Sequence, residues 1–388
     1  MTVLYGGTFD PPHTGHTAAL RAALAQLAPD RTLVIPAAEP PHKALTAMTA
    51  GAEARLAMAK LAVADMENVS VSDVEMRREG KSYTVDTLRA LAEELPGERF
   101  TVLMGTDMIE TFETWKDFRA ILGMARLGVF TRADDDEPRV RRAADALRAK
   151  YGADVVFIPH EAVEISSTEL REALPRRGGR EFLAEGVYAY IIRNRLYGAE
   201  PELAWLREQA YAMLKPKRIP HVQGTEEEAA RLAARWGADV DKAREAAILH
   251  DITKKEDYNA QLLLCDKYGI ILDHDERRNE KLLHAKTGAA VARDVFGVGD
   301  DIYNAIYWHT TGKADMTLLE KIVYLADYIE PTRDFEGVDT LRDIARRDLD
   351  AAVLKGLRMS IEEIKSRGVV PHDRTLEAAA WLARERGE

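Results

Sequence analysis

The chain has 388 residues, of which 46% are hydrophobic and 31% are charged, and its formal net charge is -11. This composition is typical of a soluble globular protein with two or three domains. No apolar run is long enough to cross a membrane, and the acidic balance gives no overall attraction to nucleic acid or to an anionic membrane. The sequence shows no secretory signal and a single cysteine, Cys265, so we expect a cytoplasmic protein without an internal disulfide.

The first half of the chain, residues 1–198, alternates short apolar runs with helical stretches such as 17–27. Six apolar runs are predicted to be strands: 2–5, 33–35, 69–72, 100–104, 127–130 and 155–158. This alternation predicts an α/β fold, with a Rossmann-like, doubly wound parallel sheet covered by helices on both faces. Ligands of such a sheet bind at the carboxyl ends of its strands.

After Gly198 the strand-like runs almost disappear, and apolar residues recur at helical spacing. Six amphipathic helices are predicted: 226–236, 241–250, 281–296, 301–308, 318–329 and 341–365. Residues 199–388 are therefore expected to form a second, all-α domain. Gly198 and Pro201 interrupt the chain between Tyr197 and Pro201, where we place the boundary.

A glycine-bearing string follows the first predicted strand and leads into the first helix. It reads Gly6-Gly7-Thr8-Phe9-Asp10-Pro11-Pro12-His13-Thr14-Gly15-His16. A strand, a glycine turn and a helix place backbone N–H groups around an anion, and two imidazoles at the helix start can bind a triphosphate. Lys43 can add a positive charge. The sequence contains neither a Walker-type loop nor a Gly-x-Gly-x-x-Gly turn, so kinase-type and dehydrogenase-type sites are disfavoured.

These residues resemble those of a known family. Residues 1–198 are similar to bacterial nicotinate-nucleotide adenylyltransferases, which belong to the nucleotidyltransferase superfamily with the His-x-Gly-His signature, here His13-Thr14-Gly15-His16. Further segments match in order: 40–43, 82–88, 105–107, 115–116, 165–171, 187–191 and 196–197. The resemblance implies that the mononucleotide phosphate attacks the α-phosphorus of ATP and releases pyrophosphate, with Mg²⁺ balancing the triphosphate charge.

The resemblance also implies residue roles. His13, His16 and Lys43 are expected to hold the ATP phosphates and to be the catalytic residues. Further ATP-binding residues are implied: Gly6, Gly7, Thr8, Phe9, Gly105, Asp107, Ile165, Ser166, Ser167 and Arg171. The nicotinate mononucleotide is expected to contact Tyr83, Thr84, Trp115 and Arg132. Preference for nicotinate over nicotinamide stays open, and riboflavin phosphate or phosphopantetheine are the alternative acceptors.

The second half contains six residues of the types that bind metals: His221, His250, Asp251, His284, His309 and Asp327. Imidazoles and carboxylates together suit Fe, Mn, Zn or Co. We expect His221 and Asp327 to join the His250-Asp251 pair at one metal, and Asp251 to bridge to a second metal held by His284 and His309. Adjacent residues cannot share one helix face, so the helix must splay or bend at that pair. The other histidines of this half, His274 and His372, and His160 are expected to lie outside the site.

The strings around these residues resemble the HD-domain phosphohydrolases, and more closely the bacterial branch that hydrolyses diadenosine tetraphosphate symmetrically to two ADP. The matching strings are 220–224, 249–254, 283–289, 308–312 and 326–333, with Lys286 as a departure. The resemblance implies one or two transition metals, with iron first, a catalytic Asp251, and Lys254 and Arg333 as polyphosphate-binding candidates. Another phosphoester substrate or a regulatory nucleotide-binding module are the alternatives, and the oligomeric state, including a homo-oligomer, stays open.

Overall fold

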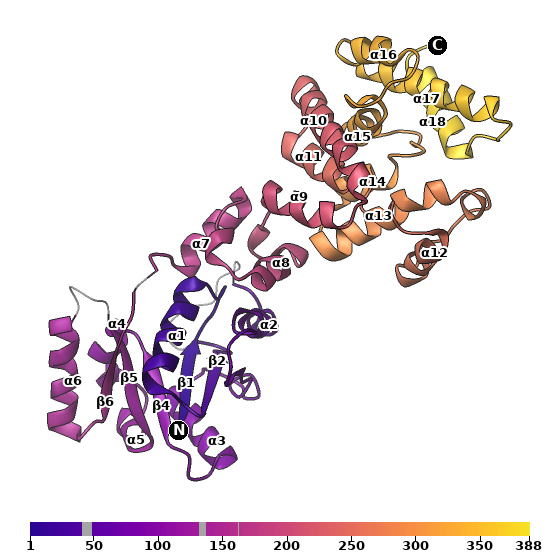
Figure 1. The fold of residues 1–388 in the computed structure, drawn as a ribbon. Helices are drawn as coiled ribbons and strands as arrows, with labels where there is room; N and C mark the ends of the chain where they lie inside the picture. Colours follow the sequence, from indigo (N-terminus) through magenta and orange to yellow (C-terminus); the bar gives the residue numbers. More distant parts are fainter. Residues whose placement is uncertain (41–48, 132–136, 162) are drawn as a thin grey trace. The chain divides into compact units, whose positions relative to one another are not determined.

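The computed structural model describes residues 1–40, 49–131, 137–161 and 163–388. Two predicted site residues, Lys43 and Arg132, lie outside the described residues. The chain divides into two compact units, Met1–Glu200 and Pro201–Glu388, each drawn in Figure 1. Among the described residues, no helix combines the length and apolar character needed to cross a membrane.

The first unit is built on a six-stranded parallel sheet with the order β3-β2-β1-β4-β5-β6. The strands are β1 Thr2–Gly7, β2 Arg31–Pro36, β3 Val69–Val71, β4 Phe100–Met104, β5 Ala125–Thr131 and β6 Val155–Pro159. Each coincides with one of the six predicted runs. The strand order reverses between β1 and β4, which is the position where doubly wound sheets bind their ligands.

Both faces of this sheet are covered. On β1, Val3 packs with residues of α1 (Thr14–Leu27) and α2 (Ala52–Ala62), whereas Leu4 packs on the opposite face with residues of α3 (Thr84–Glu94) and α6 (Glu137–Tyr151). On β2, Val34 packs on the same face of the sheet as Val3, and Leu33 packs on the same face as Leu4. Successive strand residues point to opposite faces, so a strand buried on both sides reads as a continuous apolar run.

Shorter elements complete this unit (Figure 1). They are α4 Thr106–Glu110, η1 Phe112–Thr114, α5 Phe118–Met124, α7 Ser167–Ala173, η2 Leu174–Arg176, η3 Arg180–Phe182, α8 Glu185–Arg193 and η4 Leu196–Gly198. The first helix begins at Thr14, one turn earlier than the apolar pattern predicts, because His13 takes the extended N-cap conformation. This start brings His16 into the first helical turn.

The second unit is built from helices and connecting turns, and the backbone of all its residues is described. Its helices are α9 Leu203–Ala212, α10 Ile219–Trp236, α11 Val240–Leu249, α12 Tyr258–Lys267, α13 Glu280–Phe296, α14 Asp300–Tyr307, α15 Leu318–Ile329, α16 Val338–Ala345, α17 Leu349–Ser366 and α18 Asp373–Glu385, with short 3-10 turns η5 Pro216–Arg218 and η6 Glu276–Arg278. The apolar faces of α10, α11, α15, α16, α17 and α18 share one core. Helix α10 packs against both α11 and α15, so its residues face both partners.

Two helix boundaries correct the prediction. The expected helix 341–365 is two helices, because the Asp348 side chain accepts a hydrogen bond from the Ala351 N–H at 2.9 Å and thereby caps the start of α17. The expected helix 226–236 begins at Ile219, two residues before His221. His221 therefore projects from a helix.

Candidate active sites

The carboxyl ends of β1 and β4 carry the first candidate site. These strands are neighbours in the sheet, paired from Thr2 with Phe100 to Tyr5 with Leu103. Gly6 and Gly7 end β1, and Gly105 is the N-cap residue of α4 directly after β4. Asp107, in the first turn of α4, is exposed. The residues expected to bind the two ends of ATP thus lie at one edge of the sheet, at its switch point.

Two histidines stand at the start of α1. The main-chain N–H of His13 donates to His16 Nδ1 at 3.2 Å, and the two ring centroids are 3.8 Å apart. His13 is only 8% exposed, and burial lowers its pKa to about 4, so the ring is neutral at neutral pH. Since His16 Nδ1 accepts a hydrogen bond, its proton lies on Nε2 when the ring is neutral. Both rings can therefore donate hydrogen bonds to a phosphate.

The three glycines between Gly6 and His16 differ in how closely other groups surround them. A Cβ atom on Gly7 would lie 2.9 Å from the Phe9 ring, and one on Gly15 would lie 3.0 Å from the His13 ring. A Cβ atom on Gly6 would meet nothing within 4 Å. Gly7 and Gly15 are therefore required by the packing of the loop itself, whereas the space beside Gly6 is open to a ligand.

Helix α7 begins beside the same loop. Ser167 Oγ donates to the carbonyl oxygen of Pro11 at 3.0 Å. Ser166 caps the helix by accepting from the Glu169 N–H at 3.2 Å, and its own N–H donates to Glu169 Oε2 at 2.7 Å. The structure turns Arg171 toward the protein, where Nη1 donates to the Asp10 carbonyl oxygen at 2.6 Å. Ile165 lies half-buried just before this helix.

The residues expected to hold the pyridine nucleotide also lie close together. Tyr83 is the N-cap residue of α3, which begins at Thr84. Lys116 Nζ lies 4.5 Å from the centre of the Tyr83 ring and 2.8 Å from Asp86, which brings the segment after η1 to the start of α3. Trp115 is half-buried, with its ring 5.3 Å from that of Phe112. Tyr83, Thr84 and Trp115 therefore border one region of the surface.

Sequence reasoning missed a buried arginine beneath this site. Arg55 on α2 has no exposed surface, and its guanidinium donates to the carbonyl oxygens of Thr8 at 3.0 Å, Ala37 at 2.5 Å, Ala38 at 3.0 Å and Ala50 at 3.1 Å. It joins the loop after β1 to the loop after β2. All its partners are main-chain atoms, so the sequence carries no signal for this role.

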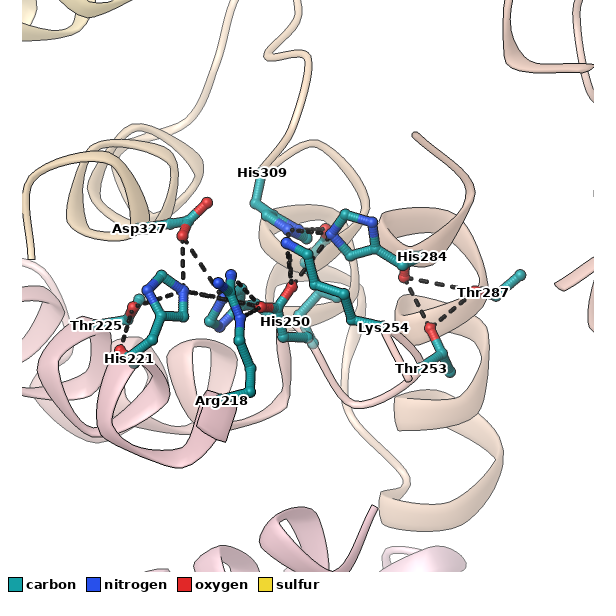
Figure 2. Close-up of polar contacts among 12 residues, drawn as sticks. Arg218, His221, Thr225, His250, Thr253, Lys254, His284, Thr287, His309 and Asp327 are labelled. Carbon is teal, nitrogen blue, oxygen red and sulfur yellow. Dashed lines mark hydrogen bonds and ion pairs between the residues drawn. The ribbon is translucent and has the colours of Figure 1, made fainter. Parts of the chain in front are cut away.

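Six side chains from five helices and turns form the second candidate site (Figure 2). They are His221 on α10, His250 and Asp251 directly after α11, His284 on α13, His309 after α14 and Asp327 on α15. Helix α11 ends at Leu249, so the His250-Asp251 pair lies in a turn and both side chains can reach the centre. A Cβ atom on Gly288 of α13 would lie 3.3 Å from the His250 carbonyl oxygen, so this glycine allows the turn to approach the helix closely.

The ligand atoms divide into two groups that share Asp251. His221 Nε2 lies 2.9 Å from Asp327 Oδ1 and 3.3 Å from His250 Nε2. His250 Nε2 in turn lies 3.3 Å from Asp251 Oδ2. His284 Nε2 lies 3.1 Å from Asp251 Oδ1 and 3.2 Å from His309 Nε2. Asp251 thus presents one carboxylate oxygen to each group. The structure brings all six residues together, and a further set of mutually close ligand atoms, from His250, His309 and Asp327, spans the two groups.

The donor set fits divalent metal ions. His250 Nδ1 donates to the Ala247 carbonyl oxygen at 2.6 Å, His309 Nδ1 donates to that of Ile306 at 2.7 Å, and His221 Nδ1 donates to Glu330 Oε1 at 3.0 Å. Each of these three rings uses its Nδ1 proton in this way. When such a ring is neutral, its Nε2 atom carries a lone pair, and these lone pairs face one another and the carboxylates. Such a convergence of electron pairs is stabilised by a cation, and outer hydrogen bonds of this kind orient histidine ligands in metal sites.

The charge states favour metal binding as well. Burial lowers the pKa of His284, and burial together with the neighbouring histidines holds the pKa of His309 well below its usual range. Burial alone would raise the pKa of Asp251, but His250, His284 and Lys254 outweigh it and hold that pKa well below normal. Burial alone would raise the pKa of Asp327 too, but the hydrogen bond with His221 and the charges of His250 and His309 together outweigh it and hold that pKa well below normal. Neutral imidazoles and ionised carboxylates are the forms that bind metals.

Three cations border the centre. Lys254 Nζ lies 3.1 Å from Asp251 Oδ1, and Arg333 Nη2 lies 2.9 Å from Asp327 Oδ1. The third, Arg218, pairs with Asp251 Oδ2 and was missed by sequence reasoning. Its place three residues before His221, as the N-cap residue of α10, was a usable signal. Figure 2 shows Arg218 and Lys254 beside the histidines. Each side chain is partly exposed, so the group can meet an anionic substrate.

The other histidines that the structure describes lie elsewhere. His274 is exposed, and the His160 ring lies 5.2 Å from that of Phe130 in the first unit. His372 forms a further cluster with Asp273 and Glu276. Its Nδ1 accepts from the Arg374 N–H at 3.1 Å, so its Nε2 carries a proton and donates to Asp273 Oδ2 at 3.1 Å. This cluster is a helix cap with a hydrogen bond from His372 to Asp273.

The folds and sites define two classes of protein: a nucleotidyltransferase built on a doubly wound sheet, and a helical HD-type domain with a cluster of residues that could hold metal ions. The chain belongs to both families, since residues 4–173 match the family described as cytidylyltransferase-like and residues 218–332 match the HD domain.

Curated relatives match one half of the chain each. A probable nicotinate-nucleotide adenylyltransferase of Shouchella clausii is 34% identical over 200 residues, which are 51% of this chain and 97% of the relative. A symmetrical bis(5'-nucleosyl)-tetraphosphatase of Bacillus subtilis is 39% identical over 185 residues, which are 45% of this chain and 97% of the relative. A further match is the crystal structure of a predicted HD superfamily hydrolase involved in NAD metabolism, from Clostridium acetobutylicum. It is 38% identical in sequence, with a TM-score of 0.46, and the match covers 47% of this chain and 97% of the hydrolase.

Proposed function

We propose that the chain is a bifunctional enzyme whose first half is a nicotinate-nucleotide adenylyltransferase. The observation that carries this proposal is the pair His13 and His16 at the start of α1, beside the carboxyl ends of β1 and β4. In the reaction, a phosphate oxygen of nicotinate mononucleotide attacks the α-phosphorus of ATP. A new phosphoanhydride forms, the bond to the β-phosphate breaks, and pyrophosphate leaves.

The residues of the chain bind and orient the reactants. His16 donates from Nε2, and His13 donates while neutral, so both stabilise the negative charge on the transferring phosphate and on pyrophosphate. Gly105 and Asp107, at the start of α4, are proposed to contact the adenosine. Tyr83 and Thr84, at the start of α3, and Trp115 are proposed to contact the pyridine ring and its ribose phosphate. Mg²⁺ would accompany ATP and balance its charge. Lys43 and Arg132 are proposed to add cations at the two substrates.

Product analysis with ATP, Mg²⁺ and nicotinate mononucleotide tests this half. We expect nicotinate adenine dinucleotide and pyrophosphate in equal amounts, and a loss of about a hundredfold or more in His16→Ala, since removing one donor that stabilises transition-state charge typically costs that much. His274→Ala, at an exposed histidine, is the matched control. Turnover of riboflavin phosphate or phosphopantetheine in place of the pyridine nucleotide would overturn the substrate assignment.

For the second half we propose symmetrical hydrolysis of diadenosine tetraphosphate to two ADP at a two-metal centre. The observation that carries this proposal is the sharing of Asp251 between the two ligand groups. His221, His250 and Asp327 would hold one metal, and His284 and His309 the other, with iron as the first candidate and manganese, cobalt or zinc as alternatives. Bound metals would supply Lewis-acid activation of water and of the phosphate oxygens. Lys254, Arg333 and Arg218 would bind the remaining phosphates of the chain.

The test uses the full chain, stripped of metal and then loaded with Fe or Mn. Diadenosine tetraphosphate should give ADP alone, whereas asymmetrical cleavage would give ATP and AMP. His250→Ala and Asp251→Ala should abolish ADP formation, and His274→Ala should not. If loaded metal is confirmed and no ADP forms, the domain acts on another phosphoester or binds nucleotides without cleaving them, which a screen of phosphoesters and a nucleotide-binding assay would separate.

A further inference from the structure

A buried carboxylate links the phosphate-binding loop of the first unit to its last element. Asp10 is only 2% exposed, and its Oδ1 accepts from the Ala50 N–H at 3.0 Å and from the Tyr197 hydroxyl at 2.8 Å. Arg171 donates to the Asp10 carbonyl oxygen at 2.6 Å and lies 3.4 Å from Oδ2. Asp10 lies three residues before His13, so these contacts fix the loop immediately ahead of the histidine pair.

The loop needs such support because its backbone is strained. Phe9 has a φ of 51°, and Tyr197 has a φ of 60°, both in the left-handed region. A residue with a side chain is disfavoured there, and such strain persists only where the surroundings overdetermine the conformation. The two strained residues are connected through Asp10, so the Tyr197–Asp10 hydrogen bond supports both.

Tyr197 cannot act on a substrate directly. Its side chain is buried, and its hydroxyl is directed at Asp10, with Met58 Sδ 3.9 Å away. Burial, and next the charge of Asp10, raise the pKa of Tyr197, which keeps the hydroxyl protonated as a donor. The contact joins residues 187 positions apart, so it ties the end of the domain to the loop after its first strand.

We propose that Tyr197 is a positioning residue for ATP: by donating to Asp10 it holds the Phe9–His13 loop in the shape that presents His13 and His16 to the phosphates. This inference rests on the proposed adenylyltransferase function. The pyridine side of the site, at Tyr83 and Trp115, is built on α3 and η1 and shares none of the hydrogen bonds of Asp10. Loss of the Tyr197 hydroxyl should therefore affect ATP and spare the mononucleotide.

Tyr197→Phe in the full chain is the test, because it removes the hydroxyl and keeps the ring. We expect the KM for ATP, and the Kd for ATP measured by calorimetry, to rise about tenfold. A tenfold change corresponds to about 1.4 kcal/mol, which is typical for the loss of one buried hydrogen bond. The KM for nicotinate mononucleotide should change less than twofold. Tyr151→Phe is the matched control, since its hydroxyl donates to Glu113 at 2.7 Å at an exposed position of the same unit, and it should leave all constants unchanged.

The outcomes are distinguishable. If Tyr197→Phe keeps the ATP constants of the wild type, or raises both KM values equally while the melting temperature falls, the positioning role is refuted and the contact is structural only. If the wild type binds no ATP and forms no dinucleotide, the proposed function itself fails. Asp10→Ala adds a second variant that removes the acceptor of the Tyr197 hydroxyl, and it should share the ATP-specific loss.

Discussion

Replacing Glu330 by glutamine is expected to weaken metal binding at the His221 side of the second site. Glu330 has no exposed surface, and its Oε1 accepts from His221 Nδ1 at 3.0 Å and from the Thr332 hydroxyl at 2.6 Å. Its Oε2 accepts from the Thr332 N–H at 2.6 Å. The carboxylate therefore satisfies three donors and fixes both the orientation and the tautomer of a metal ligand.

Glutamine has one acceptor oxygen where glutamate has two. If the amide oxygen faces His221, the amide nitrogen meets the Thr332 N–H, and two donors oppose each other in a buried place. If the amide is reversed, its nitrogen faces the His221 Nδ1–H, and two donors again oppose each other. Loss of such an outer partner typically lowers metal affinity about 10–100-fold, which corresponds to about 1.4–2.7 kcal/mol. An unsatisfied buried donor would lower the stability of the metal-free unit by about 1–3 kcal/mol as well.

Competition with a chelator, with bound metal measured by elemental analysis, gives the affinity. Glu363→Gln, at an exposed glutamate paired with Arg367 on α17, is the control and should bind metal as the wild type does. A Glu330→Gln variant with unchanged metal affinity would refute the view that this carboxylate orients His221, whatever its effect on thermal stability.

Three further predictions concern other positions. Gly224→Ala should lower metal affinity in the same chelator assay, because its Cβ atom would lie 2.5 Å from Glu330 Oε2 and must displace it; full affinity would contradict this. Asp348→Ala should destabilise the second unit by about 1 kcal/mol in denaturant unfolding, through loss of the α17 cap; an unchanged midpoint would show that the cap is dispensable. Burial lowers the pKa of His13 from its ordinary value of 6.5 to about 4 in the folded chain, so the unfolded chain binds a proton first as pH falls. Stability should therefore fall as pH drops from 6.5 to 4, by at most about 1.4 kcal/mol per pH unit. His13→Gln should flatten that pH dependence of unfolding, and a profile as steep as that of the wild type would exclude His13 as its source.

The strands could be predicted because their physical signal is local, and the six candidate metal ligands could be proposed from their residue types. A strand buried on both faces gives an unbroken apolar run, and all six runs lie in the sheet. Histidine and aspartate at a metal centre are recognisable by type. Helix boundaries were less predictable where apolar spacing continues across a break, as at Asp348, since a single capping hydrogen bond decides there.

Partners of the site residues could not be predicted where they are main-chain atoms. Arg55 donates to carbonyl oxygens from three separate segments, and any residue type would offer the same acceptor. The proton positions on His250 and His309 depend in the same way on the carbonyl oxygens of Ala247 and Ile306. These contacts depend on how the backbone folds, and the identities of the acceptor residues do not encode them.

Arg171 illustrates the difference between the type of a residue and its role. The sequence predicts a phosphate ligand, whereas the structure directs Nη1 to Asp10 and Nη2 to Thr168 Oγ1 at 3.1 Å. A guanidinium has five N–H donors, and these contacts use two of its three nitrogens, so a role in positioning Asp10 does not exhaust its capacity for a phosphate. The two roles make different demands on substitution. Lysine at this position would keep the charge for a phosphate but lose the planar fork that reaches Asp10 and Thr168 together. If Arg171 acts mainly through Asp10, Arg171→Lys should raise the KM for ATP as much as Tyr197→Phe does, and combining the two changes should add little.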